Sequence, residues 1–149
     1  MPEVQPPDAD PERLSLIVRV DDGADGGRYL VLRRVDTELE ELPALESPRS
    51  YETLRDVVAD TLRQRLGLEP AGEPLLGALR VPAMMGRRRS GARGTGWRRA
   101  VAVRAGGTLD LRPPLTSARL LPLDEAAAAL ATDAERALLR AGAELLPPA

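Results

Sequence analysis

Hydrophobic and polar positions along the chain first predict two strand hairpins. Apolar and β-branched residues dominate 14–20 and 28–35, and the Asp- and Gly-rich stretch between them is typical of a turn. Two more apolar runs, 73–85 and 97–105, flank a Gly- and Arg-rich segment, GRRRSGARGTG, that predicts the tip of a second hairpin. We also expect a short edge strand at 108–111.

Helical periodicity separates the two hairpins and returns near the end of the chain. Between the hairpins, apolar residues recur at helical spacing at Leu54, Val57, Val58, Leu62 and Leu66. Gly67 then predicts the end of this helix. A strand at 118–121 leads to two more helices, the first with Asp124 and Glu125 in its opening turn and the second over 133–146. The expected element order is ββαββ(β)βαα.

The composition restricts the available chemistry. The 149 residues include no cysteine and no histidine, which excludes disulfides, thiolate or imidazole catalysis and histidine metal ligands. With 43% hydrophobic residues, the chain is expected to form one domain over 13–149 after a disordered tail at 1–12. No apolar run is long enough to span a bilayer, so we expect a cytoplasmic protein without a membrane partner.

Charge is distributed unevenly along the chain. All 21 basic residues are arginine, which indicates GC-rich bacterial codon usage and lowers the weight of any single arginine as a functional clue. Between Pro74 and Leu109 there are eight arginines and no acid, so this stretch carries +8 and the remainder −10, for a net charge of −2. We therefore expect one positive and one negative face.

Two stretches of the sequence resemble the Nudix superfamily. One contains LP at 42–43, Glu52 and LGL at 66–68, and the other is ARLLPLDEAAAAL at 118–130. After a strand hairpin and in this order, they are similar to the family's box, G-x5-E-x7-R-E-U-x-E-E-x-G-U, and to its C-terminal half. The resemblance implies an α/β protein, a Nudix-like α/β/α sandwich with a mixed central sheet. It also implies the family's chemistry, in which helical carboxylates hold Mg²⁺ against a pyrophosphate and activate water.

Most residues that the box uses for this chemistry are replaced. With the box aligned on its last glycine, the matching residues are Glu52, Leu62, Gly67 and Leu68. The family's first glycine falls on Glu46, and its helical carboxylates fall on Thr61, Gln64 and Arg65. A guanidinium at a metal position repels the cation. This alignment predicts a degenerate box without a metal site and without a cofactor.

A second alignment keeps the hydrolase alternative open. RDVVAD at 55–60 copies R-E-U-x-E-E with aspartates for two of the three carboxylates and Ala59 for the other. The catalytic carboxylates would then be Glu46, Glu52, Asp56 and Asp60, with Mg²⁺ held by Glu52, Asp56 and Asp60. The shorter reach of aspartate and the missing loop glycines argue against this alignment. The same acids, spaced at i, i+4 and i+8, also fit a solvated polar stripe on a helix.

The Arg-rich hairpin is the other candidate site. Its candidate ligand-binding residues are Arg87, Arg88, Arg89, Arg93, Trp97, Arg98 and Arg99. Guanidinium groups bind phosphates, and an indole provides a stacking surface for a base. The tip of a hairpin is polar in any case, so a solvated loop or a surface for a protein partner explains the same residues.

These observations favour a Nudix hydrolase-like domain that is non-catalytic and binds a nucleotide-type ligand, RNA or a protein partner. The alternative is a divergent Mg²⁺-dependent pyrophosphohydrolase acting on a nucleoside diphosphate derivative, and a structural or assembly role is a third possibility. The hydrolase alternative is disfavoured by Thr61, Gln64 and Arg65, which stand where the first alignment expects metal-binding carboxylates.

Overall fold

The computed structural model describes residues 12–21, 26–33, 39–45, 53–87, 93–111 and 117–148. The tail predicted to be disordered therefore lies outside the described residues, apart from Glu12. Side chains are described for these ranges except at residues 12, 83–87 and 93–95.

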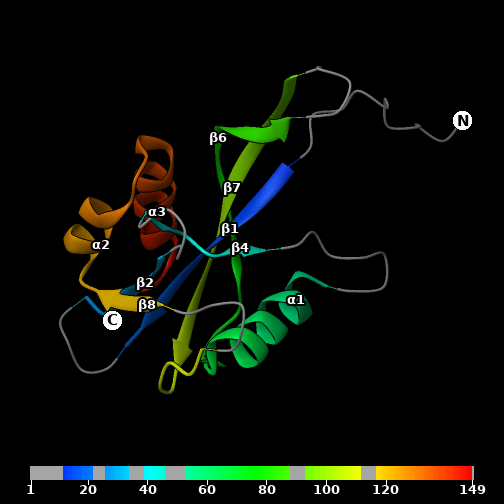
Figure 1. Cartoon of the computed structure of the whole chain (residues 1–149). Coiled ribbons are helices and arrows are strands. Elements are labelled where there is room, and N and C mark those ends of the chain that lie inside the picture. Colours follow the sequence, from blue (N-terminus) through cyan, green and yellow to red (C-terminus); the bar gives the residue numbers. More distant parts are fainter. Residues whose placement is uncertain are drawn as a thin grey trace, which may run out of the picture.

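The described residues contain eight strands, which form one mixed sheet (Figure 1). The strands are β1 Glu12–Val20, β2 Arg28–Arg33, β3 Glu40–Glu41, β4 Ala44–Leu45, β5 Glu69–Pro70, β6 Leu75–Arg87, β7 Arg93–Gly106 and β8 Ala118–Leu121. The central path runs β3-β2-β1-β7-β5, with β4 beside β1, β8 beside β2 and β6 beside β7. The pair β1–β7 is parallel and the other strand pairs are antiparallel.

Helices cover both faces of the sheet (Figure 1). The helical elements are α1 Leu54–Thr61, the π-helical turn η1 Leu62–Leu66, α2 Leu123–Ala129 and α3 Asp133–Leu145. One face packs against α1 and η1, and the other packs against α2 and α3. The predicted α/β/α sandwich with a mixed central sheet is confirmed. None of the described helices is both long and apolar enough to cross a membrane.

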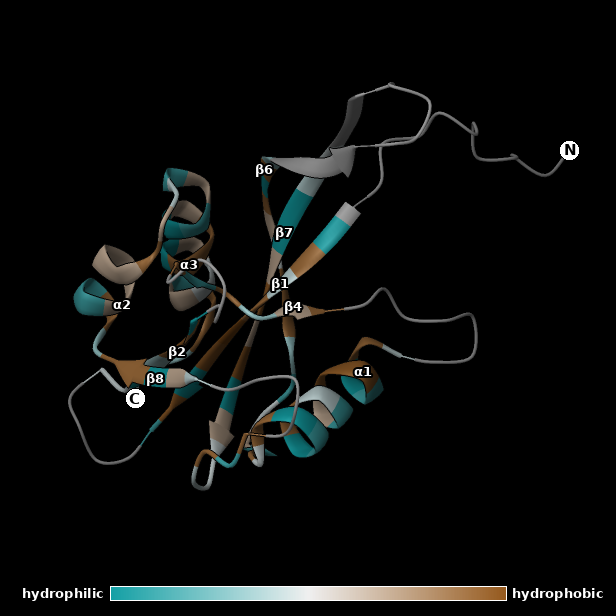
Figure 2. Cartoon of the chain, viewed as in Figure 1, coloured by the Kyte–Doolittle hydropathy of each residue, from teal (hydrophilic) through white to brown (hydrophobic). Residues whose placement is uncertain are grey.

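The sheet is buried on both faces because each central strand carries apolar residues on both sides. Leu16 and Val18 of β1 belong to the core under α1, while Ile17 belongs to the core under α2 and α3. In β2, Leu30 and Val31 divide between the two cores in the same way. Figure 2 shows hydrophobic colour along β1 and β7 where they cross the molecule, and hydrophilic turns on the helices.

Most of the longer predicted elements are present, with shifted ends. Both hairpins form, and the strand Ala118–Leu121 has the predicted bounds. The short edge strand predicted at 108–111 is wrong. The backbone N–H of Asp110 donates to the carbonyl of Leu66 at 2.9 Å, so this segment closes the end of η1. The two-residue strands β3, β4 and β5 have no counterpart among the elements expected from the sequence.

Candidate functional site

The helix predicted to carry the box begins and ends at identifiable caps. Thr53 and Asp56 form a capping box, in which each side chain accepts a backbone N–H of the other residue at 3.2 and 3.3 Å. At the other end, Gly67 has the left-handed conformation, with φ of 71°. Its Cα leaves no room for a side chain, since an added Cβ would lie 2.7 Å from the Cβ of Asp110. The helix therefore ends at the glycine that the sequence analysis predicted.

The last turn of this helix is a π-turn, which affects where its side chains lie. The N–H of Leu68 donates to the carbonyl of Leu62 at 2.9 Å, and the N–H of Gly67 donates to the same carbonyl. Leu62, Leu66 and Leu68 are all buried in the core under α1. Because the wider turn changes the angular spacing, side chains after Leu62 are displaced from the positions of a continuous α-helix.

The three residues that the first alignment places at the family's carboxylate positions lie away from these buried leucines. Thr61 is half-buried, and its hydroxyl donates to the carbonyl of Val57 at 2.8 Å, within the helix itself. Gln64 and Arg65 are exposed on η1. A hydroxyl bound within its helix, an amide and a guanidinium do not form the oxygen cage that Mg²⁺ requires. These residues do not fit a divalent cation.

The acids of the hydrolase alternative are only partly described. Asp56 and Asp60 are exposed on α1, and the Asp56 carboxylate accepts the Thr53 N–H as part of the capping box. Glu46 and Glu52 lie outside the described residues. In the described part of the chain, no three acidic side chains gather closely enough to hold a metal ion.

An open groove of about 460 Å³ lies between α1 and the segment before β6. Its lining includes Arg55, Asp56 and Arg63 from the helical segment and Gly72 and Glu73 from the loop before β6. Arg55 contacts Glu73 at 3.2 Å, and Arg63 contacts Glu69 beside the groove at 2.8 Å. These side chains are largely exposed, and such pairs add little stability.

The predicted Arg-rich hairpin is divided between the two faces of the sheet. Backbone pairing of β6 with β7 continues to Arg87 and Arg93. The side chains of these two residues, and all of Arg88 and Arg89, lie outside the described parts. The remaining candidates are consecutive on β7: Trp97, Arg98 and Arg99. Consecutive strand residues point to opposite faces, so the three do not form one cluster.

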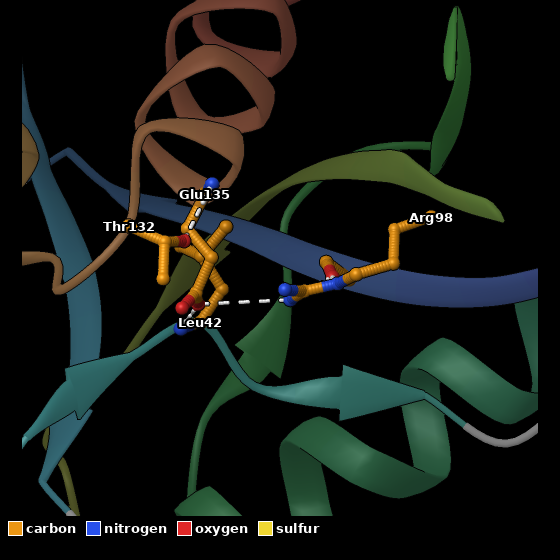
Figure 3. A network of polar contacts seen from close by, with 5 residues as sticks. Leu42, Arg98, Thr132 and Glu135 are labelled. Carbon is orange, nitrogen blue, oxygen red and sulfur yellow. Dashed lines mark hydrogen bonds and ion pairs between the residues drawn. The ribbon is translucent and has the colours of Figure 1, made fainter. Parts of the chain in front are cut away.

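Arg98 points to the α3 face, where it enters a buried polar network (Figure 3). Its Nη2 and Nε donate to the hydroxyl of Ser15 at 2.7 and 3.1 Å, and Nη2 lies 3.6 Å from Oε2 of Glu135. The same carboxylate oxygen accepts the backbone N–H of Leu42 at 2.7 Å. Ser15 and Glu135 are only 1% and 5% exposed. Arg98 therefore has internal partners that connect β1, β7, α3 and the segment between β3 and β4.

Arg99 lies on the opposite face and contacts β6. Its Nε donates to the carbonyl of Gly77 at 2.8 Å. The register of β6 against β7 shifts between Leu76 and Arg80, and Gly77 lies inside this irregularity. Trp97 shares the face of Arg99, and the residue is 37% exposed.

Sequence reasoning missed Glu135, Ser15 and Leu42 as members of a polar network. Glu135 follows Thr132 by three residues, and its backbone N–H donates to the Thr132 hydroxyl at 3.2 Å. That spacing is typical of a helix cap. The cap explains only the backbone contact of Glu135. Its side chain contacts Leu42 and Arg98, which are distant in sequence (Figure 3).

Comparison with solved structures identifies the fold. A candidate Nudix hydrolase from Listeria monocytogenes has a TM-score of 0.67 and 13% identity, covering 91% of this chain and 93% of its own. The Nudix domain of Shewanella oneidensis NrtR, complexed with ADP-ribose, has a TM-score of 0.62 and 16% identity, covering 93% and 90%. The dihydroneopterin triphosphate pyrophosphohydrolase of Escherichia coli has a TM-score of 0.59 and 12% identity, covering 91% and 97%.

Comparison of sequences finds no match for this chain, whereas comparison of structures does. The chain matches no protein-family model and no curated protein sequence. Its likeness to the three structures extends over nearly the whole chain, at low identity. The chain therefore has the Nudix fold, as its two resembling stretches predict.

Proposed function

We propose that this chain is a non-catalytic Nudix-fold module that binds a nucleotide-type ligand, specifically a nucleoside diphosphate derivative. The observation that carries the proposal is the left-handed cap at Gly67, with φ of 71°. It supports the box alignment on that glycine. In this alignment, the family's metal-binding carboxylates are replaced by Thr61, Gln64 and Arg65.

The chemistry of the replaced residues supports binding without hydrolysis. Thr61 donates its hydroxyl proton to a carbonyl in its own helix, and Arg65 adds a positive charge near the place of a metal. A cation that polarises a pyrophosphate needs several oxygen ligands held at once. An arginine still attracts an anionic ligand, so the substitution removes the cation while preserving affinity for phosphate.

The ligand class is supported by a protein of the same fold. The Nudix domain of Shewanella oneidensis NrtR was solved in complex with ADP-ribose, at 16% identity to this chain. The +8 charge of residues 74–109 also favours an anion. Two functions compete with this proposal. In the first, the Arg-rich hairpin binds RNA or a protein partner; in the second, the chain is a hydrolase that uses Glu46, Glu52, Asp56 and Asp60. One experiment separates the three functions.

The experiment combines calorimetry with product analysis. ADP-ribose, ADP, a dinucleoside polyphosphate and a short single-stranded RNA are each titrated with and without Mg²⁺, and each nucleotide is recovered and chromatographed. We expect saturable binding of ADP-ribose or ADP without Mg²⁺, and intact ligand after incubation with Mg²⁺. At a ligand concentration 100-fold above Kd, the folded state gains about 2.7 kcal/mol, visible as a raised melting temperature.

The other outcomes contradict the proposal in different ways. Mg²⁺-dependent release of a nucleoside monophosphate supports the hydrolase alternative instead. Binding of RNA alone assigns the hairpin to nucleic acid. Failure of every nucleotide and of RNA to bind overturns the proposed ligand class and leaves the protein-partner interpretation.

A further inference from the structure

The strand register collects an aromatic side chain and two arginines on the α1 face of the sheet. In β7, Trp97 and Arg99 alternate with Arg98 and therefore share the face of Val101, which belongs to the core under α1. Arg98 has the other orientation, toward Glu135 under α3. Among the predicted ligand-binding residues of the hairpin, Trp97 and Arg99 therefore lie on one face of the sheet, and Arg98 lies on the other.

Arg80 joins this pair from the neighbouring strand. It is the direct register partner of Arg99 in the β6–β7 pairing, and Pro82 is the partner of Trp97. Directly opposite side chains of an antiparallel pair lie about 5 Å apart at Cβ. Arg80, Arg99 and Trp97 therefore form a continuous surface, which we name the Trp–Arg face.

The Trp–Arg face lies in line with the start of the predicted box loop. Arg99 pairs with Leu14 of β1 on its other side, and Leu14 pairs with Leu45 of β4. Leu45, Leu14, Arg99 and Arg80 thus occupy one row across four strands. Leu14 and Leu45 belong to the core under α1, so the Trp–Arg face lies on the same side of the sheet as α1.

A bulge in β6 holds Arg99 in position. Four residue steps from Leu76 to Arg80 lie opposite two steps from Val101 to Arg99. Within the bulge, the Gly77 carbonyl accepts the Arg99 Nε–H at 2.8 Å. Bulges re-aim groups near functional sites, and here the bulge orients the guanidinium of Arg99.

From this arrangement we infer that the Trp–Arg face is the contact surface for the base and diphosphate of the proposed nucleotide-type ligand. The base stacks on the indole of Trp97, and the diphosphate receives charge-assisted hydrogen bonds from Arg99 and Arg80. The inference rests on the proposed function and adds the binding surface to it. The arginines keep their contacts within the chain and bind the ligand in addition.

Trp97 provides a direct measurement because it is the only tryptophan of the chain. Its fluorescence is recorded while ADP-ribose, ADP, adenosine and inorganic pyrophosphate are titrated, in parallel with calorimetry. We expect ADP-ribose and ADP to change the emission with the calorimetric Kd. Pyrophosphate is expected to bind with little change in emission, and adenosine to bind more weakly than ADP.

Variants then separate stacking from charge. Trp97→Leu is expected to raise Kd for ADP about 5- to 150-fold, whereas Trp97→Phe retains most of the affinity because it keeps an aromatic face. Arg99→Ala is expected to raise Kd about 10- to 150-fold, with a smaller effect for Arg99→Lys. The matched control is Arg104→Ala, since Arg104 is on the same strand but on the other face, beside Asp21 at 3.2 Å.

Three results separate a failure of this inference from a failure of the proposed function. If calorimetry detects ADP-ribose but the Trp97 emission is unchanged and Arg99→Ala binds like the wild type, the ligand lies elsewhere and the inference is overturned. If Trp97→Phe loses as much affinity as Trp97→Leu, stacking is overturned as well. If calorimetry detects no nucleotide at all, the proposed function itself fails. Thermal melting of each variant checks that it is folded.

Discussion

At the scale of single residues, Glu135 has the most consequential contacts on the α3 face. Its carboxylate accepts the Leu42 N–H at 2.7 Å and lies 3.6 Å from Arg98, while its own side chain is 7% exposed. A buried carboxylate is tolerated when it is paired and hydrogen-bonded. Glu135 therefore fastens the segment before the predicted box loop to the first turn of α3.

Removing this carboxylate is expected to destabilise the protein substantially. Glu135→Ala leaves the Leu42 N–H without its acceptor and Arg98 without its charge partner, at a cost of about 2–4 kcal/mol in the free energy of unfolding. Glu135→Gln keeps an acceptor and should cost less. Urea unfolding measures both, with Glu144→Ala on the exposed side of α3 as control. A loss for Glu135→Ala as small as that of the control would show that the network contributes little.

Residue roles were predictable only where they depend on neighbours in the sequence. Gly67 was identified as a helix end because its requirement is local. Arg98 and Arg99 were treated as one basic cluster, although strand alternation alone would have separated them. The contacts of Glu135 with Leu42 and Arg98 depend on the packing of α3 against the sheet, which no spacing within 132–135 reveals.

At the scale of elements, the end of η1 is held by two independent constraints at Gly67. Its φ of 71° disfavours any side chain, and a Cβ would lie 2.7 Å from the Asp110 Cβ. Asp110 in turn donates its backbone N–H to Leu66 at 2.9 Å. The segment after β7 and the end of the box helix therefore support each other.

Gly67→Ala is expected to cost about 2–4 kcal/mol of unfolding free energy, from the left-handed conformation together with the steric overlap. Gly26→Ala is the matched control, because Gly26 has φ of 79° but no atom within 4 Å of an added Cβ. The control should lose only the conformational part, about 1–2 kcal/mol. Chemical denaturation compares the two variants. Equal losses would mean that the contact with Asp110 imposes no additional cost.

Elements with strong local patterns were predicted well, and those defined by long-range pairing were not. The helix at Asp133–Leu145 and the strand at Ala118–Leu121 have enough periodic residues to be recognised alone. Strands β3, β4 and β5 contain two residues each and exist only because β2, β1 and β7 pair with them. The segment at 108–111 has a strand-like composition, but Asp110 bonds to Leu66 instead.

At the scale of the whole molecule, a Nudix fold carries Thr61, Gln64 and Arg65 on its first helical segment, and these side chains do not fit a metal. The likeness to solved Nudix structures extends over about nine-tenths of the chain at 12–16% identity. The packing pattern of the strands and helices is thus preserved at low sequence identity. Thr61, Gln64 and Arg65 lie outside the buried core, so the packing of the fold does not depend on them.

The response of the melting temperature to Mg²⁺ and Mn²⁺ tests the central claim most directly, since a metal stabilises only a fold that binds it. A variant with Thr61→Glu, Gln64→Glu and Arg65→Glu provides the positive comparison. The three substitutions make the charge more negative by one, one and two units. A control variant with Arg136→Glu and Arg140→Glu on α3 makes the same total change, two units at each position. We predict no metal-dependent shift for the wild type or the α3 control and a rise for the triple variant. A saturable metal-dependent rise in the wild type would contradict the account.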